Sequence, residues 1–188
     1  MAIAINGNGT ITGLSDGGLS LSGADMPAGA VIQVVSVEKD DQSTTTGTSW
    51  ADTGLTASIT PTSSSNKILV MCDWTYGASN NGYGQIQMVR TISGTDVVVN
   101  KGATSGSRTP AVSSSFFYTS YGSVYRGISE SSQFLDAPST TSAVAYKLQF
   151  RSNLSSGHTI TFNGNGKNDD RSNDPVTASH FNLLEIKV

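Results

Sequence analysis

The sequence predicts an all-β protein, an antiparallel β-sandwich of jelly-roll-like form with an extended N-terminal arm. Two observations predict the sandwich. Apolar and polar residues alternate with a period of two in several separate stretches, as in strands with one buried face. No stretch sustains the 3.6-residue period of an amphipathic helix. A third observation, the closely spaced glycines of residues 1–29, predicts the arm.

We assign residues 1–29 to the arm and residues 30–188 to one sandwich domain, since a chain of 188 residues can bury a single good core. Glycine recurs every few residues of the arm and interrupts any regular strand, yet single apolar residues lie between the glycines. Such isolated side chains favour docking on another surface. The expected docking anchors are Ile3, Ile5, Ile11, Leu14, Leu19 and Leu21.

Along the chain, strands are expected at residues 30–37, 42–50 and 55–59 before the strand that fits a core position best, residues 66–76. One face of that strand is apolar throughout and comprises Ile68, Val70, Cys72, Trp74 and Tyr76. The other face, Leu69, Met71, Asp73 and Thr75, becomes polar halfway. This pattern predicts a strand in the middle of the sandwich whose second face is covered only near its start.

Further strands are expected at residues 85–92, 97–99, 131–135, 146–151, 158–162 and 180–188. Residues 100–127 concentrate aromatic residues in a polar setting and fit either one long strand or two short ones. The total, about nine or ten short strands separated by polar turns, is typical of a sandwich or jelly roll.

Charged residues make up only 13% of the chain and the net charge is −3, so the surface has no electrostatic reason to bind nucleic acid. The N-terminus lacks the basic start and long apolar run of a secretion signal, and no segment reaches the length of a membrane span. We therefore expect neither nucleic acid nor membrane as a partner. Cys72, the one cysteine, is expected to be a small buried side chain.

No catalytic residue, cofactor or metal site is expected. Of the two histidines, His158 is in phase with Ile160 and Phe162, which favours a packed or edge position over a catalytic triad. A Gly-x-Ser-x-Gly match at residues 13–17 lies in the arm, without the strand and helix that a nucleophile elbow needs. Residues 163–174 offer oxygen ligands but match no calcium loop, so we expect a solvated loop and leave a cation there open.

Several motifs follow one another along most of the chain: Gly7-Asn-Gly-Thr-Ile-Thr-Gly-Leu14 with Gly17-Gly-Leu19; Gly54-Leu55-x-x-x-Ile59-Thr-Pro61 running into Ser65-Asn-Lys-Ile-Leu-Val70; Phe134-Leu-Asp136 before Pro138; Tyr146-Lys-Leu-Gln-Phe-Arg-Ser152; and Leu183-Leu-Glu-Ile186. The ordered set resembles virion proteins of tailed bacteriophages, especially β-sandwich modules of fibres and other appendages. The resemblance implies a non-enzymatic homotrimer with a jelly-roll-like fold similar to the C1q and tumour-necrosis-factor type.

The short arm departs from the long fibres that carry many such modules, and it favours a capsid decoration or cement protein. The expected partners are its own copies and the major capsid protein or another virion protein, and the expected location is the virion, after synthesis in the host cytoplasm. The alternative is a tail-fibre or spike tip that binds a host-surface glycan or protein. Its expected receptor surface comprises Tyr83, Tyr118, Tyr121 and Tyr125, although packing in the sandwich and in subunit contacts is the favoured interpretation of these aromatics.

Overall fold

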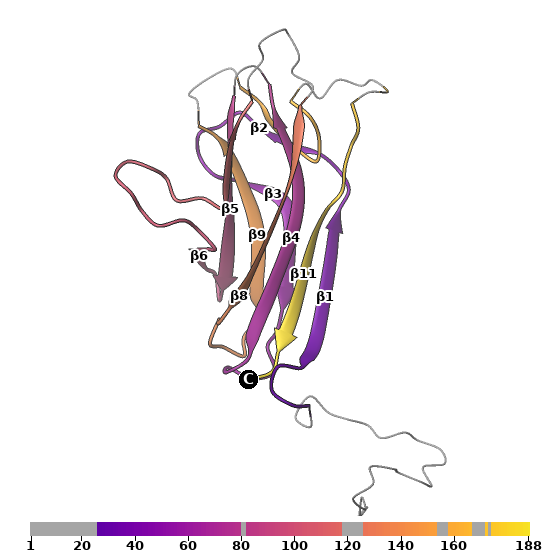
Figure 1. Cartoon of the computed structure of the whole chain (residues 1–188), viewed down its shortest axis with the longest axis vertical. Helices are drawn as coiled ribbons and strands as arrows, with labels where there is room; N and C mark the ends of the chain where they lie inside the picture. The colour runs from indigo at the N-terminus through magenta and orange to yellow at the C-terminus, as the bar shows by residue number, and fades with distance from the viewer. Residues whose placement is uncertain (1–25, 80–81, 118–125, 154–157, 167–171, 173) are drawn as a thin grey trace, which may run out of the picture.

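Two antiparallel sheets pack face to face in the computed structural model (Figure 1). The structure describes residues 26–79, 82–117, 126–153, 158–166, 172 and 174–188. The strands of this described part are β1 (Val31–Lys39), β2 (Ser43–Thr45), β3 (Ala51–Ile59), β4 (Lys67–Ala78), β5 (Tyr83–Ile92), β6 (Thr95–Val99), β7 (Ser113–Phe116), β8 (Gly127–Asp136), β9 (Val144–Ser152), β10 (Ile160–Phe162) and β11 (Ser179–Ile186).

Strand β4 is the centre of the first sheet, sheet A. It pairs with β8 along one edge, and with β11 and then β10 along the other. Strand β1 lies outside β11, and β2 lies outside β10. In the second sheet, sheet B, β9 pairs with β3 and β5, and both β6 and β7 pair with the far edge of β5. Successive long strands thus alternate between the sheets, which confirms the predicted sandwich and gives it jelly-roll connectivity.

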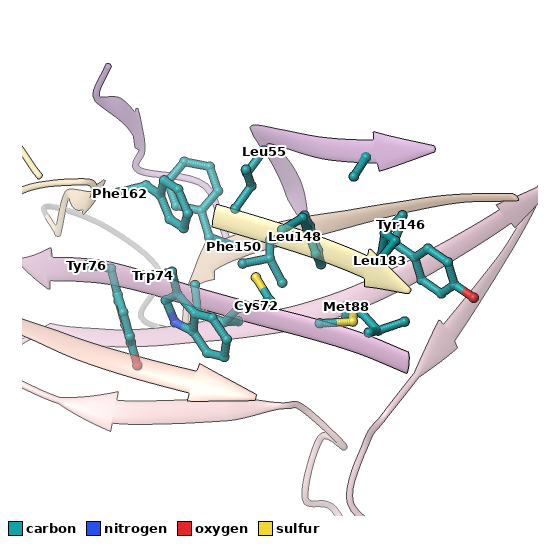
Figure 2. Packing of buried hydrophobic residues seen from close by; sticks show 14 of the residues in the cluster. Leu55, Cys72, Trp74, Tyr76, Met88, Tyr146, Leu148, Phe150, Phe162 and Leu183 are labelled. Carbon is teal, nitrogen blue, oxygen red and sulfur yellow. The ribbon is translucent and has the colours of Figure 1, made fainter. Parts of the chain in front are cut away.

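The core lies between the sheets and follows the predicted alternation of β4. Its inward residues, from Ile68 to Tyr76 at every second position, are at most 3% exposed and meet Met88, Leu148 and Phe150 of sheet B (Figure 2). Burial raises the pKa of the Cys72 thiol, as expected for a packed side chain. On the outward face Leu69 is half-buried, whereas Met71 and Asp73 are exposed.

Three expected elements differ from the structure. Only Ser43–Thr45 of the expected strand 42–50 is a strand. The Arg151 guanidinium lies over the Trp50 ring, 4.5 Å from the ring centroid. Residues 100–127 contain β7 and the first residue of β8, separated by the undescribed residues 118–125. The strand expected at 131–135 extends over Gly127–Asp136, because β8 pairs with β4 along its whole length.

The loop that begins at residue 163 is not solvated at its start, contrary to expectation. Asn163 is fully buried, and its side-chain amide donates to the carbonyl oxygens of Lys39 (2.8 Å) and Asp41 (3.0 Å). Ser179 Oγ donates to the Asn163 side-chain oxygen. The side chain therefore ties the end of β10 to the turn after β1 and to the start of β11, which explains why so polar a residue is buried.

At the opposite end of the sandwich, a buried carboxylate holds the turn between β3 and β4. Glu185 of β11 is fully buried, and its Oε1 accepts hydrogen bonds from Thr62 N (2.7 Å), Thr62 Oγ1 (2.8 Å) and Asn66 Nδ2 (2.7 Å). The Gln33 amide nitrogen, turned toward β11, donates to Oε2 at 3.1 Å. Hydrogen bonds replace the water that this carboxylate loses on burial.

Glu185→Leu is expected to lower the free energy of unfolding by about 2 kcal/mol, because the buried Asn66 amide and the part-buried donors of Thr62 lose the carboxylate oxygen that accepts from them. Glu185→Gln keeps the acceptor oxygen, and Gln33 can rotate its amide to face the new nitrogen, so about 1 kcal/mol is expected to be lost. Urea unfolding of both variants measures the difference. Equal stability of the leucine variant and the wild type would contradict this role.

Candidate functional site: an apolar face on sheet A

A continuous row of apolar side chains crosses the outer face of sheet A. The strand register places Val34 of β1 opposite Leu184 of β11, Leu184 opposite Leu69 of β4, and Leu69 opposite Leu135 of β8. The adjacent row, which includes Leu183 and Val70, points into the core, so the period of two turns these four outward. Val34 is 60% exposed and Leu135 is 52% exposed.

The row widens on both sides into a patch. Val31, which pairs with Ile186, is 44% exposed at one side, and Met71 is 38% exposed at the other. We call this patch the apolar face; it comprises Val31, Val34, Leu69, Met71, Leu135, Leu184 and Ile186. Scattered apolar residues are normal on a protein surface, whereas a contiguous apolar patch is a candidate interaction site.

A hollow of about 350 Å³ adjoins the apolar face. Met71 forms one side of it, and Asp73, Gln133 and Asn182 supply polar groups around it. The side chain of Asn182 accepts a hydrogen bond from Ser36 Oγ at 2.8 Å, which fixes its orientation. An apolar patch beside an oriented polar hollow has the arrangement of a protein interface, with an apolar centre and a polar rim.

Beyond the hollow lies a charged row centred on His180. Its Nδ1 lies 3.0 Å from Asp73 Oδ2, and its Nε2 lies 3.4 Å from Glu38 Oε2. The hydrogen bond to Asp73, followed by the charges of both carboxylates, raises the pKa of His180 above its ordinary value. His180 thus joins an ion-pair row at the rim of the patch, and its two ring nitrogens both face carboxylates.

The other predicted surface residues are only partly within the described chain. Tyr83 is 38% exposed at the start of β5. Nearby Phe117 is buried, with its ring edge-on to Tyr76 at 5.5 Å. Tyr118, Tyr121 and Tyr125 lie outside the described residues, as do the expected arm anchors Ile3, Ile5, Ile11, Leu14, Leu19 and Leu21.

The first described residues, 26–30, lie beside the apolar face. Gly29 N donates to Lys187 O at 2.8 Å, and Lys187 N donates to Ala30 O at 2.9 Å. The Lys187 ammonium also donates to the Met26 carbonyl. Because Lys187 follows Ile186 of the apolar face, residues 26–30 run along the same end of sheet A (Figure 1).

Within the described ranges, no group of three or more His, Cys, Asp or Glu side chains converges as a metal site would require. The described part of the loop expected to offer oxygen ligands is instead bonded internally: Asn165 Nδ2 donates to Asp174 Oδ1 at 2.6 Å. No helix of the described residues has the length and hydropathy needed to cross a membrane.

No protein-family model matches the chain, and no curated protein matches it. Among solved structures, it is similar to a chain in the structure of infectious bursal disease virus, Gx strain. The sequence identity is 8%, the match covers 83% of this chain, and the TM-score is 0.42. This chain spans only 37% of the length of that viral chain.

Protonated His180 is expected to stabilise the fold, because its carboxylate neighbours raise its folded pKa. The contribution is fully present below the unfolded pKa, about 6.5, and is lost as the pH rises through the folded value. His180→Gln should therefore reduce stability slightly in acid and leave it unchanged in alkali. In an NMR titration, Asp73→Asn should lower the His180 pKa. An unchanged His180 pKa would contradict the ion-pair row.

Proposed function

We propose that this protein is a non-enzymatic structural component of a tailed-phage virion, a decoration or cement protein that assembles as a homotrimer through the apolar face. The observation that carries the proposal is the unbroken row Val34, Leu184, Leu69 and Leu135 across four strands. The sandwich fold and the neutral, weakly charged surface support a role in assembly. The phage assignment and the trimer come from the sequence resemblance.

Self-association through this face follows from its size and composition. Four strands about 4.8 Å apart make the row roughly 15 Å wide, enough for the centre of an interface but not for the whole of one. The hollow and the charged row around His180 supply the polar rim. In a closed trimer, three copies turn this face toward a common axis, so that each copy covers apolar surface of its neighbours.

The arm would attach the trimer to the capsid. Twenty-five residues precede Met26, and an extended chain of that length reaches roughly 80 Å, far beyond the sandwich itself. The chain leaves the sandwich at the end that carries the apolar face. Three arms would thus leave the trimer from the same end and dock through their apolar anchors on neighbouring capsid subunits.

The alternative, a fibre or spike tip that binds a host receptor, is favoured by one observation. Tyr83, an exposed aromatic residue, begins β5 at the end of the sandwich remote from Met26 and the C-terminus (Figure 1). An arm at one end and an aromatic surface at the other would suit attachment and recognition respectively. Capsid binding and host adsorption therefore have to be measured side by side.

Val34→Glu is expected to convert the trimer to monomers, because it places a charge in the middle of the proposed interface. Val97 of β6, which is 44% exposed on sheet B, provides the matched control Val97→Glu. Light scattering after gel filtration measures the mass, and Val97→Glu should remain a trimer. Urea unfolding should show that neither substitution changes the stability of the sandwich itself by more than about 0.5 kcal/mol. A monomeric wild type, or a Val34→Glu trimer, would refute the interface.

Deletion of residues 2–25 is expected to leave a folded trimer that no longer binds capsids, since it keeps Met26 and the hydrogen bonds that join Met26, Gly29 and Ala30 to Lys187. Co-sedimentation with particles that lack the protein measures binding. Leu19→Ser with Leu21→Ser should weaken it, whereas Ser20→Ala with Ser22→Ala should not. Unimpaired capsid binding by the truncated protein would refute the cement role, and a loss of host adsorption on Tyr83→Ala would then support the receptor-binding alternative.

A further inference from the structure

A hairpin interrupts the edge of sheet B. Strands β6 and β7 both pair with the same edge of β5. Strand β6 ends at Val99, opposite Met88, and β7 begins at Ser113, opposite Ile86. A continuous strand would place one residue between these two pairs, whereas the chain has thirteen, residues 100–112. The extra residues leave the sheet and return to the same place, so they are an insertion held at both ends by paired strands, a common setting for functional loops.

The insertion, which we call the edge hairpin, has its own antiparallel hydrogen bonds. Gly102 N donates to Ala111 O at 3.4 Å, and Arg108 N donates to Ser105 O at 3.1 Å across the turn. Gly106 in this turn has a φ of +58°, which glycine adopts without strain. About six residues on each arm give the edge hairpin a reach of roughly 20 Å. It projects sideways from the sandwich on the side of β5, away from β1 (Figure 1).

The edge hairpin carries two cations and no anion. Lys101 and Arg108 are both exposed, and neither has an ion-pair partner within the described ranges. By contrast, Lys39, Arg90 and Lys147 each pair with an aspartate. Unpaired cations on a projecting element fit an acidic partner surface. Two cations without an aromatic residue between them favour a protein surface over a nucleic acid, which binds proteins through many cations and stacking rings.

An acidic surface lies at the opposite edge of sheet A. Glu38, Asp40 and Asp41 are all exposed, at the end of β1 and in the turn after it. We call residues 38–41 the acidic turn; Lys39 is the one cation among them. Its carboxylates outnumber its cation, so it has the charge that the edge hairpin needs in a partner.

The edge hairpin and the acidic turn start from the same level of sheet A. Asn100, at the base of the hairpin, donates to Ser132 of β8, and Ser132 lies opposite Cys72 of β4. The next residue of β4, Asp73, lies opposite His180, which in turn lies opposite Glu38. The two levels thus differ by one residue, about 3.3 Å along the strand. The hairpin is joined to the β8 edge, and the turn belongs to the β1 edge.

We propose that, in the trimer, the edge hairpin of one copy docks on the acidic turn of the next copy. Three apolar faces turned toward a common axis, with their strands along it, bring the β8 edge of each copy to the β1 edge of its neighbour. A closed ring needs two different surfaces that meet head to tail at equal height, and the hairpin and the turn meet both conditions. This contact rests on the trimer of the proposed function and adds the surfaces that join its copies.

The test reverses the charges of the full chain. Lys101→Glu with Arg108→Glu should raise the concentration at which half of the trimer dissociates by about tenfold or more at low salt, because like charges then face one another. Sedimentation over a range of protein concentrations measures this value. Adding Asp40→Lys and Asp41→Lys to the same chain reverses both surfaces and should restore it. Lys101→Arg with Arg108→Lys is the matched control, which keeps both charges and should leave the value unchanged.

The outcomes separate this contact from the proposed function. A wild-type trimer whose dissociation is unchanged by Lys101→Glu with Arg108→Glu would overturn the hairpin contact and leave the apolar face as the interface. If the same variant keeps the trimer but loses binding to capsids or to a DNA duplex, the edge hairpin has that other partner and the proposal is overturned. A monomeric wild type would overturn the trimer and the hairpin contact together.

Discussion

Strand β4 is hydrogen-bonded along both edges, and this double pairing determines where the other parts of the molecule lie. Its register with β8 and β11 decides which residues of three strands share each row. A slip of one residue would turn Trp74 into solvent and Asp73 into the core, so burial of the indole holds the register. The same register turns Leu69 outward. The core and the apolar face thus depend on the same strand register.

The sequence predicted the faces of β4 because its alternation is long and one side is apolar throughout. It failed where tertiary contacts override local pattern. The sequence predicts a loop at Asn163, yet this residue is buried, and its side-chain amide donates to carbonyl oxygens of a turn that is distant in sequence. Residues 46–50 have strand composition, yet Trp50 packs on Arg151 instead. Local sequence indicates which secondary structure a residue favours, whereas its packing and hydrogen-bond partners come from other parts of the chain.

The apolar face could not be predicted from the sequence, because it depends on how strands pair. Leu69 is an apolar residue on the less apolar side of its strand, and Val34 shares one side of its own strand with Ile32. Only the register shows that these residues and Leu135 form one row. The arm anchors and three of the four surface tyrosines lie outside the described residues and stay predictions.

The separation of inward and outward side chains on sheet A also bears on how this protein can change over generations. Residues such as Val34 and Leu135 are exposed and contribute little to the core, so their substitution should change the free energy of unfolding only slightly. Val70 and Leu183, in the neighbouring inward row, have no such freedom, because both are fully buried. A lineage with this architecture can therefore change the chemistry of its outer surface through a few outward substitutions while its inward residues stay nearly fixed.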